Sequence, residues 1–244
     1  YVTIFLCSEI GKFFYKKGVC FPKTIKILCS NEHLCYNTRR HEAAQYNRMR
    51  LAAQGRKSMH TNDGLTLLAY GYEAEICPER GANLLRLACP ALKTDALRTP
   101  LSIENMVQDN PYLWGIPILF PPNRISGASF TFQNRVYRWP MNEPDTGCFL
   151  HGTIHQTPFQ VIEHTNTRAT LIYQATANKP YLFFPHAFTM RVNYALTPQG
   201  IVQKILIRND SLQDMPVSIG FHTTFRIPFV QGGDSEQVRL QLSC

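Results

Sequence analysis

The 244-residue sequence lacks the short motifs that identify the most familiar classes of catalytic and nucleotide-binding proteins. It contains no CxxC pair, no HExxH, no GxSxG, no phosphate-binding loop and no glycine-rich dinucleotide fingerprint. Its cysteines and histidines also have no zinc-finger spacing. The sequence therefore gives no support to a zinc protein, a serine hydrolase of the GxSxG type or a nucleotide-dependent enzyme.

Long hydrophobic runs are also missing. The longest apolar stretch, residues 112–122, is too short to span a bilayer and contains three prolines. We recognise no secretory signal, so the eight cysteines are most simply interpreted as reduced thiols. These features predict a cytoplasmic protein without a membrane partner.

The net charge of +8 is confined to one end of the chain. Residues 1–58 carry eleven Lys and Arg against three Asp and Glu, whereas residues 59–244 carry fourteen of each. The basic character therefore says nothing about the partner of the main domain, and we expect no nucleic-acid binding there.

The leading segment, residues 1–58, differs from the rest in pattern as well as in charge. Residues 37–54 could form a basic helix, and a transit peptide or a nucleic-acid-binding arm are alternatives for the segment. A non-native extension fits its mixture of Lys, Cys and Phe better. We expect residues 1–58 to be disordered or non-native, with Met59 as the first natural residue.

From residue 63 onward the sequence alternates between apolar and polar positions. Turn formers separate strand-like runs at intervals of roughly 8–12 residues, which is typical of an all-β sandwich or barrel. The predicted strands include two runs around a Pro-Glu-Arg-Gly turn, a buried strand at 114–120, a hairpin at 129–139, and runs at 159–164, 169–175, 188–196, 201–208 and 217–221. No sustained helical stripe and no repeat of fixed period is present.

Three polar residues stand at the ends of predicted strands beside turn formers. Arg124 follows a Pro-Pro-Asn turn, His151 precedes Gly152, and His222 lies in a GFHTTF stretch. An Arg and two His at the rim of a sheet suit a polyol, because they offer several hydrogen bonds to hydroxyls. Each of the three could instead be a structural residue that bonds a neighbouring carbonyl.

The other histidines are weaker candidates. His155 forms an HxxxH spacing with His151, which would bind a metal on a helix, but Gly152 and Pro158 argue against a helix here. His164 and His186 are interpreted as structural. We expect no metal site.

Taken in order, several stretches resemble the aldose 1-epimerase (galactose mutarotase) family. They are Arg-Gly-Ala-Asn-Leu at 80–84, Asn-Arg-Ile at 123–125, a Phe-x-Phe…Tyr hairpin, Leu-His-Gly at 150–152 and Gly-Phe-His-Thr-Thr-Phe at 220–225. The resemblance runs from about residue 64 to residue 229. It implies a large antiparallel β-sandwich that binds sugar in a cleft on one sheet, without metal or organic cofactor.

The same resemblance implies roles for the three residues. The substrate-binding arginine of the family falls on Arg124, its first active-site histidine on His151 and its second on His222. Two departures stand out. The family's Thr-Asn-His signature is here Gly-Phe-His, and the family's downstream aspartate and catalytic glutamate have no counterpart, because Asp234 and Glu236 come far too early.

The sequence thus predicts an isomerase that interconverts the α and β anomers of a free aldohexose, with His222 and His151 as catalytic residues and Arg124 and His151 as sugar-binding residues. We expect residues 59–244 to be the N-terminal portion of the sandwich, incomplete at the C-terminus and inactive as given for want of the carboxylate. A hexose-6-phosphate 1-epimerase and a non-catalytic carbohydrate-binding protein remain as alternatives.

Overall fold

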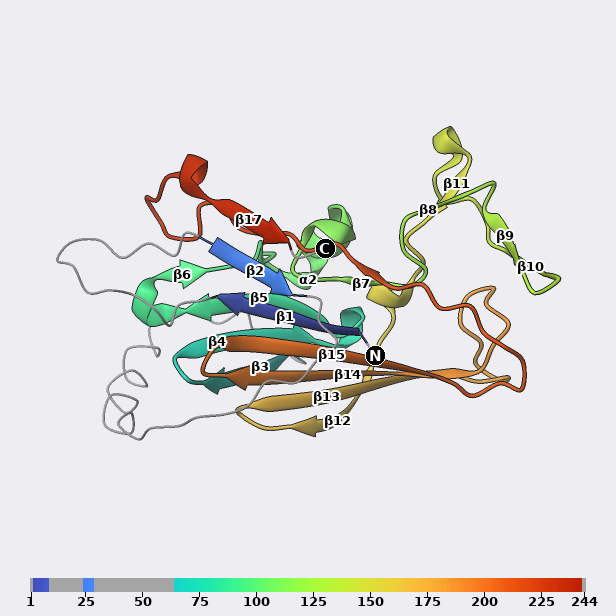
Figure 1. The fold of residues 1–244 in the computed structure, drawn as a ribbon, viewed down its shortest axis with the longest axis horizontal. Coiled ribbons are helices and arrows are strands. Elements are labelled where there is room, and N and C mark those ends of the chain that lie inside the picture. Colours follow the sequence, from blue (N-terminus) through green and yellow to red (C-terminus); the bar gives the residue numbers. More distant parts are fainter. Residues whose placement is uncertain (1, 9–23, 29–63, 243–244) are drawn as a thin grey trace.

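The computed structural model describes residues 2–8, 24–28 and 64–242, with side chains over 64–239, and this part of the chain consists almost wholly of β-strands (Figure 1). Its one α-helix is the short α2 (Ile103–Gln108). Six single-turn 3-10 helices also occur there: η2 (Pro78–Arg80), η3 (Pro90–Leu92), η4 (Pro111–Leu113), η5 (Pro144–Thr146), η6 (Ile154–Gln156) and η7 (Ser235–Gln237). None of the described helices is long and apolar enough to cross a membrane.

The larger sheet has seven strands. In spatial order they are β12 (Gln160–His164), β13 (Arg168–Ala175), β14 (Phe188–Thr197), β15 (Gly200–Asn209), β1 (Val2–Ser8), β2 (Thr24–Leu28) and β17 (Arg239–Leu242). Neighbouring strands are antiparallel except β17, which pairs with β2 in parallel.

Alternation in the sequence explains the long central pair of this sheet. In β14 every second residue is buried, and Phe188, Met190 and Val192 are completely inaccessible to solvent. β15 returns antiparallel to it after a tight turn, with Thr197 opposite Gly200. The predicted strands 188–196 and 201–208 are confirmed, each extended by one or two residues.

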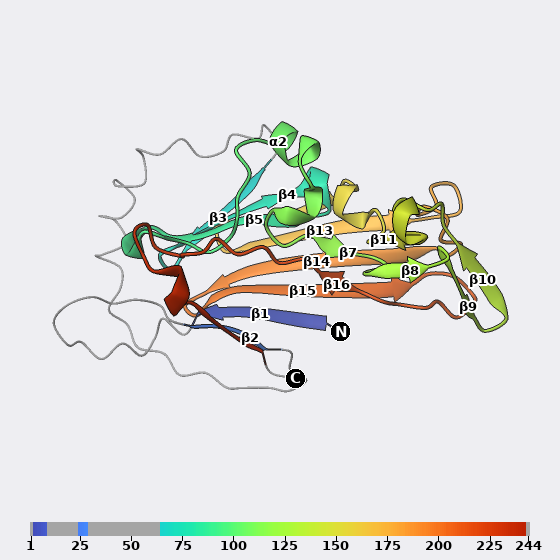
Figure 2. The ribbon, with the colours of Figure 1, turned by 90° about the horizontal axis from the view of Figure 1, so that it is seen from above.

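The smaller sheet has four strands in sequence order: β3 (Leu65–Ala69), β4 (Tyr72–Cys77), β5 (Asn83–Cys89) and β6 (Thr94–Asp95). The predicted Pro-Glu-Arg-Gly turn joins β4 to β5, where Gly81 adopts a left-handed conformation (φ 67°). Residues of both sheets contribute to one hydrophobic core, and the Tyr194 hydroxyl donates to the Ala82 carbonyl across it at 2.7 Å. The two sheets lie over one another as layers (Figure 2). The predicted all-β sandwich is confirmed.

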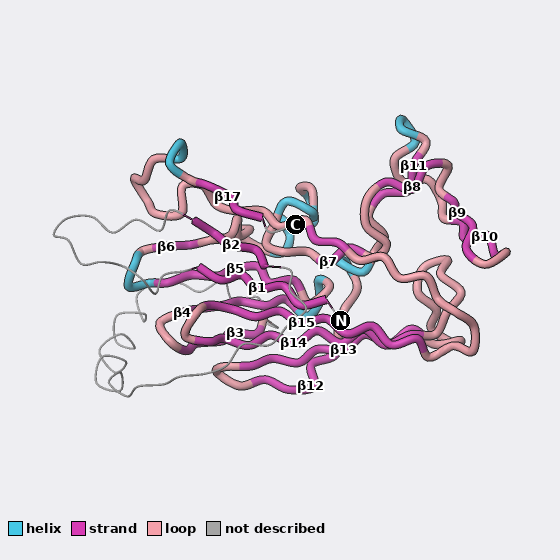
Figure 3. Tube along the Cα trace, viewed as in Figure 1, coloured by secondary structure: helices cyan, strands magenta, loops and turns pink. Residues whose placement is uncertain are grey.

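Three two-stranded ladders complete the described fold. They are β7 (Ile118–Leu119) with β16 (Gly220–Phe221), β8 (Arg124–Ser126) with β11 (Cys148–Leu150), and β9 (Ser129–Phe132) with β10 (Arg135–Arg138). The last is the predicted hairpin, whose turn residues Gln133 and Asn134 both have positive φ. It extends with β8 and β11 beyond the ends of the sheets (Figure 3).

Two predicted strands are shorter than expected, and a polar stretch between predicted strands forms two short elements. Only residues 118–119 of the run 114–120 and residues 220–221 of the run 217–221 form ladders. Pro117 and Pro121 flank the first of these and cannot donate to a ladder. The polar stretch 93–110, for which the sequence analysis gives no strand, contains β6 and α2. Ser102 caps α2 by accepting from the Asn105 amide.

The leading segment is described only in part. β1 and β2 belong to it and pair within the seven-stranded sheet. The remaining residues up to 58, including the predicted helix at 37–54, lie outside the described part of the chain. The expectation that 1–58 is disordered or non-native stays a prediction.

Candidate functional site

The structure brings the two predicted histidines together from separate ladders. His151 follows β11, and His222 follows β16. Their ring centroids lie 5.8 Å apart with the ring planes at 77°. Arg124 begins β8 and pairs with Leu150, the residue just before His151. All three predicted residues therefore lie at the same end of these short ladders.

A close backbone approach fixes the position of His151. Gly152 (φ 61°) bridges to Phe120, and a Cβ on Gly152 would lie 2.0 Å from the Phe120 carbonyl oxygen. His151 itself has a left-handed φ of 65°. Only glycine fits at position 152, so this contact places the preceding histidine at the rim of the ladder.

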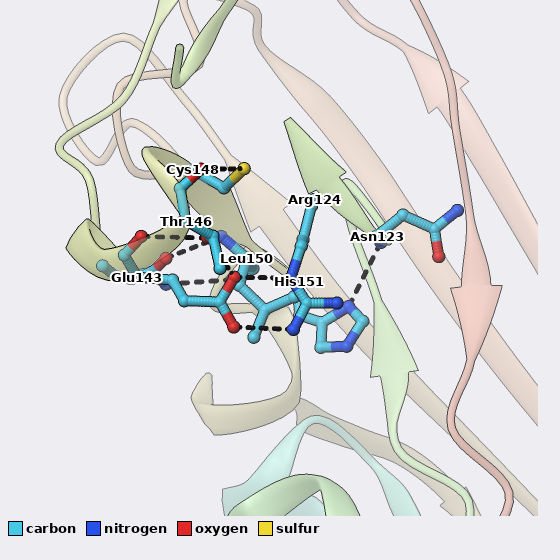
Figure 4. Close-up of polar contacts among 8 residues, drawn as sticks. Asn123, Arg124, Glu143, Thr146, Cys148, Leu150 and His151 are labelled. Carbon is cyan, nitrogen blue, oxygen red and sulfur yellow. Dashed lines mark hydrogen bonds and ion pairs between the residues drawn. The ribbon is translucent and has the colours of Figure 1, made fainter. Parts of the chain in front are cut away.

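Two hydrogen bonds link His151 to Asn123, and one of them orients the imidazole (Figure 4). The His151 amide donates to the Asn123 carbonyl at 3.1 Å, and the Asn123 amide donates to His151 Nδ1 at 3.1 Å. Because Nδ1 accepts, the proton of the neutral ring is on Nε2. Burial lowers the pKa of His151, as do the nearby His222 and Arg124, while Glu143 opposes them. His151 is thus neutral at neutral pH and offers an N–H donor.

Sequence reasoning missed Tyr112, whose ring lies among three histidines. Its centroid is 4.7 Å from those of His151 and His155 and 6.3 Å from that of His222. Burial, and secondarily the charge of Glu143, raise the pKa of the Tyr112 phenol, which stays protonated. A tyrosine ahead of a buried run is common, so the sequence carried no specific signal for this contact.

His155 lies behind this cluster and is completely buried. Burial lowers its pKa to about 4, with smaller effects from His151 and Arg80. The segment that follows His151 forms the 3-10 turn η6, so the HxxxH pair is not carried on an α-helix. Within residues 64–239, no group of three or more His, Cys, Asp or Glu is arranged to hold a metal ion.

Arg124 forms an ion pair with Glu143, a second residue that the sequence analysis did not select. Nε donates to Glu143 Oε2 at 2.5 Å, and Nη2 donates to Oε1 at 2.7 Å (Figure 4). The Arg124 guanidinium, with the Thr146 hydroxyl, holds the pKa of Glu143 down to about 2. Glu143 is therefore ionised at neutral pH. Its only signal in the sequence is its place in the loop before His151.

The arrangement offers neutral and charged donors close together. His151 and His222 supply imidazoles, and Tyr112 supplies an aromatic face and a hydroxyl. Arg124 supplies a guanidinium whose position is held by its ion pair with Glu143. Imidazoles change protonation near neutral pH, whereas the arginine keeps its charge. Such a set can bind several hydroxyls and exchange a proton with one of them.

The chain is similar to several known proteins. The family model for aldose 1-epimerase matches residues 66–243. The uncharacterised protein YihR of Escherichia coli K12 is 30% identical over 169 residues, which cover 68% of this chain and 51% of YihR.

Solved structures agree with this match. A galactose mutarotase-like protein from Clostridium acetobutylicum is 32% identical, with a TM-score of 0.65 over 69% of this chain and 52% of its own. A galactose mutarotase related enzyme from Lactobacillus acidophilus, 21% identical with a TM-score of 0.54 over 70% of this chain and 51% of its own, shares the fold. The chain thus spans about half the length of the relatives it matches. With most of its described sandwich inside the matched region, the chain belongs to the aldose 1-epimerase family.

Proposed function

We propose that this protein interconverts the α and β anomers of a free aldohexose. The observation that carries the proposal is the pairing of His151 with His222, 5.8 Å apart, beside an arginine whose position is fixed by Glu143. In this assignment His222 is the acid that protonates the ring oxygen O5. His151 and Arg124 donate to the ring hydroxyls and hold the sugar.

The chemistry explains why these residue types are needed. Ring opening removes the proton from O1 while O5 is protonated; rotation about C1–C2 and closure then give either anomer. An imidazole can exchange a proton near neutral pH, and a carboxylate is a suitable partner as the base. Arg124 is a poor acid because it keeps its proton, so its part is to bind and orient.

Two alternatives use the same fold. A hexose-6-phosphate 1-epimerase would need cationic groups for the phosphate. A carbohydrate-binding protein without catalysis would bind sugar but leave the rate of anomer exchange unchanged. We also propose a cytoplasmic localisation. The free thiols of Cys77, Cys89 and Cys148 are consistent with it.

The first test compares anomer exchange by two chains. The resemblance to the family implies that its carboxylates downstream of the second histidine have no counterpart among residues 1–244. We therefore expect this chain to bind D-galactose but to exchange its anomers slowly. A version lengthened at its C-terminus with the corresponding segment of a family member should be much faster.

Polarimetry of freshly dissolved α-D-galactose measures both rates. Equal rates for the two chains would contradict the need for a downstream base and would turn attention to a carboxylate within the present chain. Absence of both binding and exchange in the lengthened version would overturn the proposed function itself.

A further inference from the structure

The ion pair between Arg124 and Glu143 is built into the fold by main-chain contacts. Glu143 and Cys148 exchange two backbone hydrogen bonds of 3.2 Å each, and Cys148 belongs to β11, the strand that pairs with β8. Because Arg124 begins β8, both members of the pair are held on neighbouring segments. The Thr146 hydroxyl donates to Glu143 Oε2 at 2.5 Å and fixes the carboxylate further.

The pair occupies one edge of the guanidinium. Nε and Nη2 form the edge that commonly binds a carboxylate or phosphate with two parallel hydrogen bonds, and Glu143 takes both. Nη1 has no hydrogen-bond partner within the described residues, and the side chain is exposed at its surface. Arg124 can therefore still donate to a hydroxyl, while its preferred anion-binding edge is filled.

The charges near His151 also favour an uncharged ligand over an anion. Arg124 and Glu143 both act on the charge of His151, as does His222, and the formal charges of the Arg124–Glu143 pair cancel. A neutral hydroxyl loses little from the nearby Glu143 carboxylate, whereas a phosphate or sugar carboxylate that approaches the Arg124 guanidinium would meet a like charge beside it. Like charges brought together in this way oppose binding.

We propose that Glu143 is a specificity-determining residue that restricts the site to uncharged sugars by occupying the anion-binding edge of Arg124. This inference rests on the proposed function for the identity of the ligand, but its electrostatic part is testable without any sugar. It selects free aldohexoses over hexose phosphates as the substrate class.

The test uses the full 244-residue chain and four proteins: wild type, Glu143→Gln, Glu143→Asp and Asp145→Asn. Asp145→Asn is the matched control, because it makes the same change in charge two residues away without touching the ion pair. Glu143→Asp keeps the negative charge. Thermal unfolding and near-ultraviolet circular dichroism establish that each variant is folded.

The first measurement is a titration with inorganic phosphate, followed by phosphorus NMR. We expect Glu143→Gln to bind phosphate about tenfold more tightly than wild type, because a freed guanidinium edge no longer faces a like charge. Glu143→Asp and Asp145→Asn should stay close to wild type. Unchanged phosphate binding in Glu143→Gln, or an equal gain in Asp145→Asn, would overturn the inference.

The second measurement compares D-galactose with D-galactose 6-phosphate by calorimetry. In wild type the free sugar should bind more tightly, and Glu143→Gln should shift the ratio by about tenfold toward the phosphate ester. An unshifted ratio would also overturn the inference. If no variant binds either sugar, the proposed function fails, while the phosphate titration still decides whether Glu143 excludes anions.

Discussion

Replacing His222 by alanine should slow anomer exchange by about 10²- to 10⁴-fold, the range that general acid catalysis supplies. The comparison is made in the lengthened version of the chain, where a base is present. The loss follows because ring opening needs a proton at O5 as the O1 proton leaves, and alanine provides none. Exchange NMR between the α and β anomers of D-galactose gives the rate, and calorimetry gives the affinity.

The control for this variant is His164→Gln. His164 lies on β12, where its Nε2 is 2.9 Å from the Thr66 carbonyl, and it belongs to no part of the candidate site. Its replacement should leave the rate of anomer exchange within about twofold of the wild-type rate, because the change is at the surface and away from the site. A His222→Ala enzyme that exchanges anomers as fast as wild type would show that His222 is not the acid, even if sugar still binds.

Gly152→Ala should cost about 3 kcal/mol or more of the free energy of unfolding, because two penalties combine. The residue has a left-handed φ of 61°, and an added Cβ would overlap the Phe120 carbonyl oxygen at 2.0 Å. The contact is with main chain on both sides, so neither partner can rotate away. Relief requires the segment after β11 to move, which displaces His151 and should weaken sugar binding as well.

Gly127→Ala separates these two penalties. Gly127 has nearly the same φ, 63°, but nothing lies within 4 Å of its added Cβ. Gly127→Ala should lose only about 1 kcal/mol of the free energy of unfolding, the cost of an alanine in the left-handed conformation. Denaturant unfolding of both variants measures the difference. Equal losses would mean that the approach of Gly152 to Phe120 does not constrain the fold.

Predictions from the sequence were correct where the structure depends on local patterns of neighbouring residues. Alternation in β14 and β15 predicted both strands, and the Gln133-Asn134 turn predicted the β9–β10 hairpin, because the chemistry of strands and turns is local. Arg124, His151 and His222 were selected from their turns and from the family resemblance. The structure then placed the two histidines side by side.

The residues that were missed depend on contacts between distant segments. Tyr112 joins the histidines only through the packing of η4, and Glu143 reaches Arg124 only because β8 and β11 pair. Neither residue has a distinctive local sequence. The lengths of β7 and β16 were overestimated for a related reason, since an apolar run indicates burial but not ladder hydrogen bonds.

The most direct measurement is an NMR titration of the histidine side chains of the present chain with D-galactose. Binding at the proposed site should shift the imidazole signals of His151 and His222 saturably and with one dissociation constant, each signal being assigned from its glutamine variant. His164 on β12 and His186, whose Nε2 is 2.7 Å from the Tyr137 hydroxyl, should not move. Galactose that binds without shifting His151 and His222, or that shifts all four alike, would contradict a sugar site at these two histidines.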